Sequence, residues 1–580
     1  MKYKKIVFGL LLVATSFTAC NKELDSLLTN PNYPSTETAD VNLYLNKIQL
    51  DFNGFFQNAS GAAGPLARIN NAWGGPFYRN GASPASYDGL WYTAYSSIFS
   101  NVDAMIPLAQ SQKKFIQSGM ARVMKAYTLG TMVDLFGDVP YSEAVKGTDN
   151  TTPSVDGGAK VYAAVQAILD SAIIDLNNTS AAGGPSIDLY YGGNKAKWIT
   201  LAKTLKLKFY MNTRLVDKAG STAAIQTLLT ENNLINSSAN DFQFQYGKSL
   251  SPDSRHPDYA GDYNNNGGGG YLSNYFMWKV ASEKYSGNVT GVASTTIPAT
   301  TGDPRLRYYF YRQTTNYAWA DASSCPCILN FTNQVFPIWY PAVPEKTPFC
   351  VVGGKGYMGR DHGDNSGGPP DGKYKTQHGI YPAGGEFDYS QGKQLSLGLG
   401  AGGNGISPIW LSSFTAFLKA EAVLTLGVTA KEGDAATLLA SGVAQSITKV
   451  VGFPAAIGYQ NTAIPAAVLD QTTQIANYKT KVDGLYSAAA TSADKLDLVI
   501  SEYHIALFGN GLEAYNNLRR TGSPKNAQLA VATATPGIFG YSFYYPSVFV
   551  DRNSNAPAQK AIGTAANKVF WDNNPANFIK

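Results

Sequence analysis

The sequence has 580 residues, which is long enough to bury a large hydrophobic core. Only 15% of the residues are charged and 12% are aromatic, a composition that excludes an intrinsically disordered chain. The formal net charge of +5 falls to +2 without the three lysines of the first nineteen residues, and so nearly neutral a surface argues against a nucleic-acid-binding protein.

The first twenty residues have the pattern of an export signal. Three lysines within the first five residues precede an apolar stretch, Ile6–Ala14, that is too short to span a bilayer. Ser-Phe-Thr-Ala then leads into Cys20, and this sequence resembles a bacterial lipobox. We therefore predict that residues 1–19 are a lipoprotein signal peptide and that Cys20 carries the lipid. An ordinary secretory signal is the alternative.

Residues 20–38 are expected to form a tether between the lipid and the folded body. They are mostly polar, and Pro31 and Pro34 prevent a stable helix. The acidic residues soon after Cys20 resemble the surface-export signal of Bacteroidetes lipoproteins. The remaining chain, residues 39–580, is predicted to be a single body.

The first part of this body, residues 39–236, has apolar residues at helical spacing. The periodic segments are 40–58, 88–110, 120–135, 161–176 and 198–212. Each should bury one apolar face. Asn212 falls on the apolar seam of the last helix, so we expect it to bond a neighbouring element.

A second helical part is predicted for residues 408–522. It starts near Ile409 with a stripe through Trp410 that ends at Gly427, a residue typical of a helix C-terminus. Further helical segments are 438–447, 496–507 and 512–518. Amphipathic helices joined by short turns indicate an all-α fold of stacked helical hairpins.

The segment between the helical parts, residues 237–407, is rich in glycine pairs and polar runs and is predicted to form long loops with at most short β-hairpins. Recurrent Tyr and Trp disfavour disorder, and loops this long are usually functional. Residues 523–580 are expected to be irregular.

Four stretches together resemble the SusD/RagB family of nutrient-binding outer-membrane lipoproteins, in particular its SusD-like subgroup. They are Leu135–Ala144 (LFGDVPYSEA), the Leu/Lys helix that begins at Trp198, Asp303–Leu306 (DPRL) and Tyr515–Gly522 (YNNLRRTG). With the lipobox they cover nearly the whole chain in family order. As local structure, the Gly and Pro of the first motif should stop a helix, and the two arginines of the last should lie at a helix C-terminus.

The resemblance implies about four tetratricopeptide-like helix pairs that carry an irregular ligand-binding face. It implies a lipid-anchored protein of the outer membrane, at the cell surface, without catalytic activity. Family members capture oligosaccharides, or in some cases peptides, and deliver them to a TonB-dependent (SusC-like) transporter as its lid subunit.

Aromatic side chains on loops are the candidate ligand contacts, because sugar rings pack their apolar faces on Trp and Tyr while hydroxyl groups need polar neighbours. A cluster after the first helix and several central residues fit this description. They are Trp73, Tyr78, Arg79 and Asn80, followed by Trp278, Tyr317, Trp319, Trp339, Tyr340 and Tyr357. For each ring the alternative is a packing role in the core. The rings of Trp198 and Trp410 lie on helical stripes and are predicted to be core.

A polar loop offers a possible Ca²⁺ site. Asp361, Asp364 and Asp371, with Asn365, could supply oxygen ligands, although their spacing is not that of an EF-hand. The alternative is a set of Asx turns in which Arg360 neutralises a carboxylate.

Cysteine usage leaves two possibilities open. After Cys20, the remaining cysteines are Cys325, Cys327 and Cys350, and their spacing does not form a zinc knuckle. Either Cys350 bridges one of the other two, or all three are free thiols in packed loops.

Catalysis is not expected. The four histidines show neither a metalloprotease nor a triad pattern, and the sequence has no nucleophile elbow. A non-catalytic receptor is therefore the preferred interpretation. A surface-anchored glycan hydrolase and a non-binding structural surface lipoprotein are the alternatives.

Overall fold

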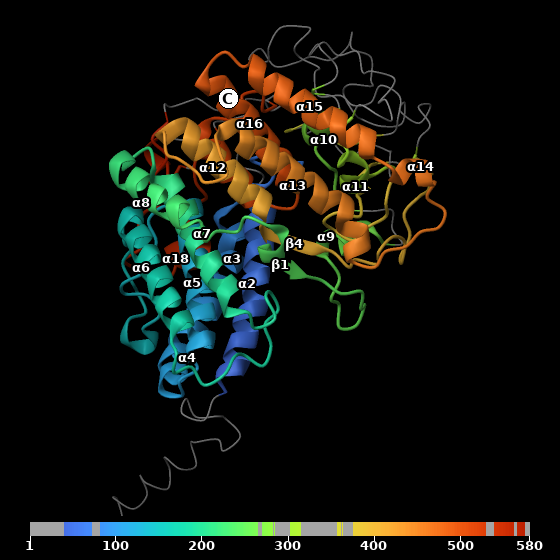
Figure 1. Ribbon diagram of the computed structural model, residues 1–580. Coiled ribbons are helices and arrows are strands. Elements are labelled where there is room, and N and C mark those ends of the chain that lie inside the picture. Colours follow the sequence, from blue (N-terminus) through green and yellow to red (C-terminus); the bar gives the residue numbers. More distant parts are fainter. Residues whose placement is uncertain are drawn as a thin grey trace, which may run out of the picture.

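The structure is a computed structural model, which describes residues 40–71, 82–264, 269–281, 283–284, 302–314, 357–360, 362–363, 375–528, 539–561 and 565–574. Helices dominate these residues, and the strands are few and short (Figure 1). The predicted all-α, tetratricopeptide-like scaffold is confirmed. Among the helices in these ranges, none combines the length and apolarity that a membrane crossing requires.

The first helical part stands as a row in which each long helix contacts the next along the chain (Figure 1). The predicted helices are present. The first starts after Asp40, whose carboxylate accepts a hydrogen bond from Asn42 N at 2.8 Å. The helices are α2 (Val41–Ala63), α3 (Asp88–Tyr92), α4 (Ser100–Ser111), α5 (Phe115–Phe136), α6 (Gly158–Asn177), α7 (Lys195–Thr213) and α8 (Lys218–Glu231).

The predicted helix over 88–110 contains a wider turn in its middle. Between α3 and α4 the backbone forms a π-helix, η3 (Thr93–Phe99). Ser100 Oγ donates to the carbonyl of Tyr95 at 2.9 Å, so a side chain satisfies one backbone acceptor there. Further along, α5 ends at Gly137 with φ 77°, which confirms the helix stop of the first motif.

The second helical part packs above the first in Figure 1, and its last helix contacts α2, so the two parts close on each other. Its helices are α12 (Ser412–Leu426), α13 (Ala435–Ala456), α14 (Ala466–Leu469), α15 (Thr472–Ala488), α16 (Ser492–Ala506) and α17 (Gly511–Thr521). The predicted end of α12 at Gly427 is confirmed, with φ 68°.

One helix start was predicted wrongly. The stripe that begins near Ile409 is not helical there, because Ile406–Trp410 is strand β4 and α12 starts only at Ser412. Pro408 disfavours a helix through this segment, and β4 pairs antiparallel with β1 (Phe242–Gln245). The Trp410 ring is nevertheless fully buried, as predicted for a core residue.

The strands in the described parts of the central segment are short, as expected, but the three short helices there were not predicted. Strands β2 (Phe310–Tyr311) and β3 (Gln377–His378) pair antiparallel, and both sheets join segments that are far apart in the sequence. The helices of this segment are α9 (Pro257–Asp262), α10 (Asn274–Ala281) and α11 (Leu306–Tyr309). Near the C-terminus the described residues form two short helical turns, α18 (Ser547–Val550) and the 3₁₀ turn η7 (Ala565–Asn567).

A buried carboxylate, Asp134 on α5, joins the helices of both parts. It accepts hydrogen bonds from Lys208 Nζ at 3.1 Å, Asn516 Nδ2 at 3.1 Å and Trp571 Nε1 at 3.0 Å. Nearby, Asn212 Nδ2 donates to Tyr162 OH at 3.0 Å, which confirms the predicted bond from the seam of α7. Because a buried charge needs partners, these elements are held at fixed positions.

The arginines of the YNNLRRTG motif lie in the last turn of α17, as predicted, and both are buried. Arg520 makes two hydrogen bonds of 2.8 Å to the carboxylate of Glu421 on α12. Arg214, at the end of α7, contacts the same carboxylate at 3.1 Å. Glu421 therefore links α7, α12 and α17.

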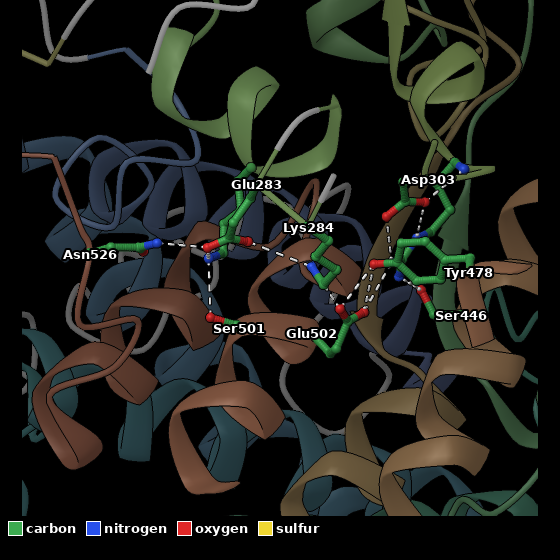
Figure 2. Close-up of polar contacts among 10 residues, drawn as sticks. Glu283, Lys284, Asp303, Ser446, Tyr478, Ser501, Glu502 and Asn526 are labelled. Carbon is green, nitrogen blue, oxygen red and sulfur yellow. Dashed lines mark hydrogen bonds and ion pairs between the residues drawn. The ribbon is translucent and has the colours of Figure 1, made fainter. Parts of the chain in front are cut away.

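A third buried carboxylate, Glu502 on α16, attaches the central segment to the second helical part (Figure 2). Its two oxygens lie 2.8 Å from Lys284 Nζ and 3.2 Å from Arg305 Nη2, and Tyr478 OH donates to it at 2.9 Å. Arg305 also pairs with Asp303 at 2.7 Å. One carboxylate thus binds the chain on both sides of residues 285–301.

Replacing Glu502 by glutamine is expected to lower the free energy of unfolding by about 3–5 kcal/mol, because Lys284 and Arg305 would stay buried with one carboxylate fewer. Urea denaturation followed by circular dichroism measures the change. Asp494→Asn, on the same helix, is the control: its pair with Lys525 is about half exposed, so the loss should stay below about 1 kcal/mol. Equal losses in both variants would contradict the assigned role of Glu502.

Candidate ligand-binding pocket

A pocket of about 180 Å³ lies where the first helical part, the central segment and the second helical part meet. Its wall comes from the end of α2, from α9, from β3 and from the turn between α16 and α17. The lining residues that matter below are Asn58, Asn70, Asp258, His378, Phe508 and Gly511. A pocket at such a junction can be shaped by side chains from all three regions.

The base of the pocket forms because two helix ends approach closely. A Cβ on Gly511, the first residue of α17, would lie 2.4 Å from the Cα of Gly64, so only glycine allows this contact. Ser60 Oγ accepts a hydrogen bond from Gly511 N at 2.8 Å, which ties α2 to the start of α17. The base is therefore backbone packed against backbone.

One wall carries a charged pair. His378 Nδ1 lies 2.8 Å from Asp262 Oδ2, and its Nε2 lies 3.8 Å from Asp258 Oδ2. Burial opposes a charge on the ring, but the two carboxylates outweigh it and raise the pKa of His378 to about 9. The ring also stacks on Phe508, with centroids 5.8 Å apart. His378 is therefore a fixed imidazolium at neutral pH.

Asp258 presents its carboxylate to the pocket. Its side chain is 45% exposed, and a second histidine, His256, lies 3.8 Å from its Oδ2. Burial lowers the pKa of His256 to about 4, so that ring is neutral at pH 7. Although burial raises the pKa of Asp258, His378 and His256 hold it below its usual value. The carboxylate is thus ionised and within reach of a ligand.

Two amide side chains of the pocket have unused hydrogen-bonding capacity. Asn58, exposed on α2, and Asn70, half-buried beyond its end, line the pocket. Neither side chain makes a hydrogen bond within the residues that the structure describes. Each amide can both donate and accept, which is what a hydroxyl-rich ligand requires.

The chemistry of these groups suits binding better than proton transfer. With its pKa near 9, His378 keeps its proton at neutral pH and cannot serve as a general base there. Asp258, Asn58 and Asn70 supply polar contacts, and the Phe508 ring beside them supplies apolar surface. Among the residues placed in the structure, no three His, Cys, Asp or Glu side chains gather as metal ligands.

Most residues predicted from the sequence as ligand contacts lie outside the described residues. This holds for Trp73, Tyr78, Arg79, Asn80, Tyr317, Trp319, Trp339 and Tyr340, for the aspartates Asp361, Asp364 and Asp371, and for Cys20, Cys325, Cys327 and Cys350. These predictions stay untested.

Trp278 and Tyr357 are the two predicted contacts that the structure describes. Their exposed fractions are 4% and 2%, and the guanidinium of Arg312 lies 4.7 Å above the Tyr357 ring. Neither residue lines the pocket. Both rings pack within the protein, which corresponds to the alternative considered for loop aromatics.

The polar residues that line the pocket were not predicted from the sequence as site residues. One signal was present: Asp258 and Asp262 are four residues apart behind a proline, a spacing that puts two carboxylates on one face of a helix. Their partner His378 follows 116 residues after Asp262, so sequence spacing could not connect them.

Comparison with known proteins connects the chain to one group. A family model described as "Starch-binding associating with outer membrane" matches residues 78–266, and one described as "Susd and RagB outer membrane lipoprotein" matches residues 404–564. Together the two models match more than half of the chain. No curated protein matches.

Several solved structures share the fold. A chitin-binding protein is 20% identical, with a TM-score of 0.63 over 92% of this chain and all of its own. A SusD/RagB family protein from Bacteroides thetaiotaomicron is 18% identical, with a TM-score of 0.62 over 93% of this chain and all of its own. A chitin-binding SusD homologue from Flavobacterium johnsoniae is 18% identical, with a TM-score of 0.55 over 91% of this chain and 99% of its own. At these identities the similarity establishes the fold.

His378 of the pocket and its neighbour His256 should titrate at very different pH values. In NMR spectra we expect His378 to titrate near pH 9 and His256 near pH 4. Since folding raises the pKa of His378, its stabilisation is complete below about pH 6.5 and is lost as the pH rises through 9.

Asp262→Asn should lower the pKa of His378, whereas Asp253→Asn, whose partner is Arg255, should not change it. Titration of His378 at or below pH 6.5 in the unaltered protein would refute the charged pair.

Proposed function

Since this chain belongs to the SusD/RagB family of outer-membrane lipoproteins, we propose that it is a cell-surface receptor that binds nutrient oligosaccharides and delivers them to a TonB-dependent (SusC-like) transporter as its lid subunit. The observation that carries the binding role is the pocket between α2, α9 and the α16–α17 turn. It combines an ionised carboxylate with unengaged amides on a rigid base.

Oligosaccharides suit this pocket because their hydroxyl groups pair well with planar carboxylates and amides. In the proposed complex, Asp258 accepts hydrogen bonds from sugar hydroxyl groups. The side-chain amides of Asn58 and Asn70 donate hydrogen bonds to other hydroxyl groups of the sugar and accept hydrogen bonds from them. Two structures of the same fold are described as chitin-binding proteins, which supports a glycan rather than a peptide as the first ligand to test.

Aromatic residues next to the pocket in the sequence are proposed to supply the stacking surface. Trp73 follows Asn70 by three positions, and Tyr78, Arg79 and Asn80 follow in the same stretch. Trp319 and Trp339 belong to the loop-rich central segment and are proposed for the same role. Such rings would hold the apolar faces of successive sugars.

The proposed lipid anchor rests on the signal sequence before Cys20, and the proposed transporter partner rests on membership of the family. Lipidation at Cys20 would hold the folded body at the outer membrane without a membrane-spanning helix. A TonB-dependent barrel partner is the expectation for a receptor that cannot itself move a ligand across the membrane.

Binding can be measured by calorimetry on the purified chain with a panel of oligosaccharides and peptides. We expect saturable binding of a glycan without turnover, and at least about tenfold weaker binding for Asp258→Ala and for Trp73→Ala. Glu231→Ala is the control for Asp258, because Glu231 is also about half exposed and ion-paired but lies on α8.

Release of shortened sugars would instead indicate a hydrolase. The absence of any binding would leave a structural surface lipoprotein. Tight binding of peptides alone would replace the glycan with a peptide ligand.

Anchoring and partnership predict a second set of results. Cys20→Ser should abolish incorporation of labelled fatty acid and move the protein from the detergent phase to the aqueous phase. The unaltered protein, extracted from outer membranes with mild detergent, should co-purify with a large β-barrel encoded by a neighbouring gene. Fatty-acid labelling that persists in the variant would contradict lipidation at Cys20. Purification without a barrel would contradict the partnership with a transporter.

A further inference from the structure

A second pocket, of about 350 Å³, lies beside the π-helix and shares no lining residue with the first. Its wall is formed by η3, by the segment that follows α5 and by α18. The residues that carry the argument are Trp91, Tyr95, Val145, Lys146, Phe549 and Arg552. The volume falls in the range of about 300–1,000 Å³ that small-molecule sites occupy.

Three aromatic rings form the apolar side of this pocket and are fixed in place. The ring of Trp91 lies between those of Tyr95 and Phe549, with centroid distances of 4.8 and 4.7 Å. Tyr95 is only half-buried, and its hydroxyl donates to the carbonyl of Pro140 at 2.7 Å. Trp91 and Phe549 are only 7% and 5% exposed, so they support the Tyr95 ring, and that half-buried ring is the flat apolar surface that a ligand can reach.

The backbone on two sides of the pocket departs from ordinary geometry. Tyr95 belongs to the π-helix, a wide turn that is rare in proteins and frequent at functional sites. On the facing segment, Val145 has φ 59°, which is strained for a β-branched residue. Strain of this kind persists where the surroundings impose it, and it accumulates at ligand sites.

The charged side chains that line this pocket are all positive. Lys146 and Arg552 are exposed, and neither makes an ion pair or a hydrogen bond with any side chain that the structure places. None of the described lining residues is Asp or Glu. Two nearby acids are already engaged: Glu143 accepts from Ser154 N at 2.9 Å, and Asp156 pairs with Lys160 at 2.6 Å.

We propose that this pocket is a separate binding site for an acidic saccharide, whose carboxylate pairs with Lys146 and Arg552 while its sugar ring lies against Tyr95. A uronic acid unit has both features, a carboxylate and an apolar ring face. A peptide of aspartates would pair with the two cations, but it has no ring face that could pack on the aromatic side of the pocket. The proposal concerns a different pocket from the first and does not depend on the function proposed above.

Calorimetry on the full chain in detergent tests the site with three probes: an oligogalacturonate, a neutral galactose oligomer of equal length and monomeric glucuronate. We expect saturable binding of the oligogalacturonate, weakened by added salt, and none of the neutral oligomer. Lys146→Ala and Arg552→Ala should each weaken binding about tenfold. Binding of glucuronate with the same dependence would assign the site to a free sugar acid.

The control is Lys195→Ala, another exposed lysine that does not line the pocket, and it should leave the affinity unchanged. Tyr95→Phe keeps the ring and should bind within about twofold of the unaltered protein, whereas Tyr95→Ala should bind clearly more weakly. Equal affinity for both oligomers, oligogalacturonate binding that survives loss of both cations, or tighter binding of an oligoaspartate peptide would overturn the proposal.

Discussion

The fold depends on the neutralisation of buried carboxylates by groups from distant parts of the chain. Asp134, Glu421 and Glu502 are all fully buried. Removing a carboxylate from water costs several kcal/mol unless partners with good geometry surround it. Each of the three therefore fixes the position of every element that supplies it with a partner. Together they hold the first helical part, the central segment, the second helical part and the C-terminal segment in one arrangement.

The rigid helical scaffold determines where polar side chains for ligand binding can lie. The helical parts supply a base that cannot shift, as at the contact between Gly64 and Gly511. Polar side chains such as Asp258 then project from short elements and loops at the edge of that base. In a protein built in this way, loop residues can change while the scaffold keeps its shape.

The helical scaffold was predictable because the apolar residues of an amphipathic helix recur every three or four positions within one short stretch of sequence. The α2 and α6 helices each bury one stripe whose spacing can be read from the sequence, whereas α5, predicted to bury a single stripe, is buried on nearly every side. Asn212 on α7 marks a polar contact on an apolar seam. The start of α12 was mistaken because an all-buried strand and a helix share an apolar pattern, and the pairing with β1 stabilises the strand here. The pocket was not predictable, since Asp258 and His378 meet only in the folded chain.

The partners of Asp134 also bear on the order in which the molecule can fold. Asn516 and Trp571 follow this carboxylate by 382 and 437 residues, so both are synthesised long after the helices around it. Until they arrive, the helical hairpins of the first part enclose an acid with an incomplete set of partners. The first part alone would therefore lack two of the groups that neutralise this carboxylate, and we expect its hairpins to be less stable until Asn516 and Trp571 have packed against them.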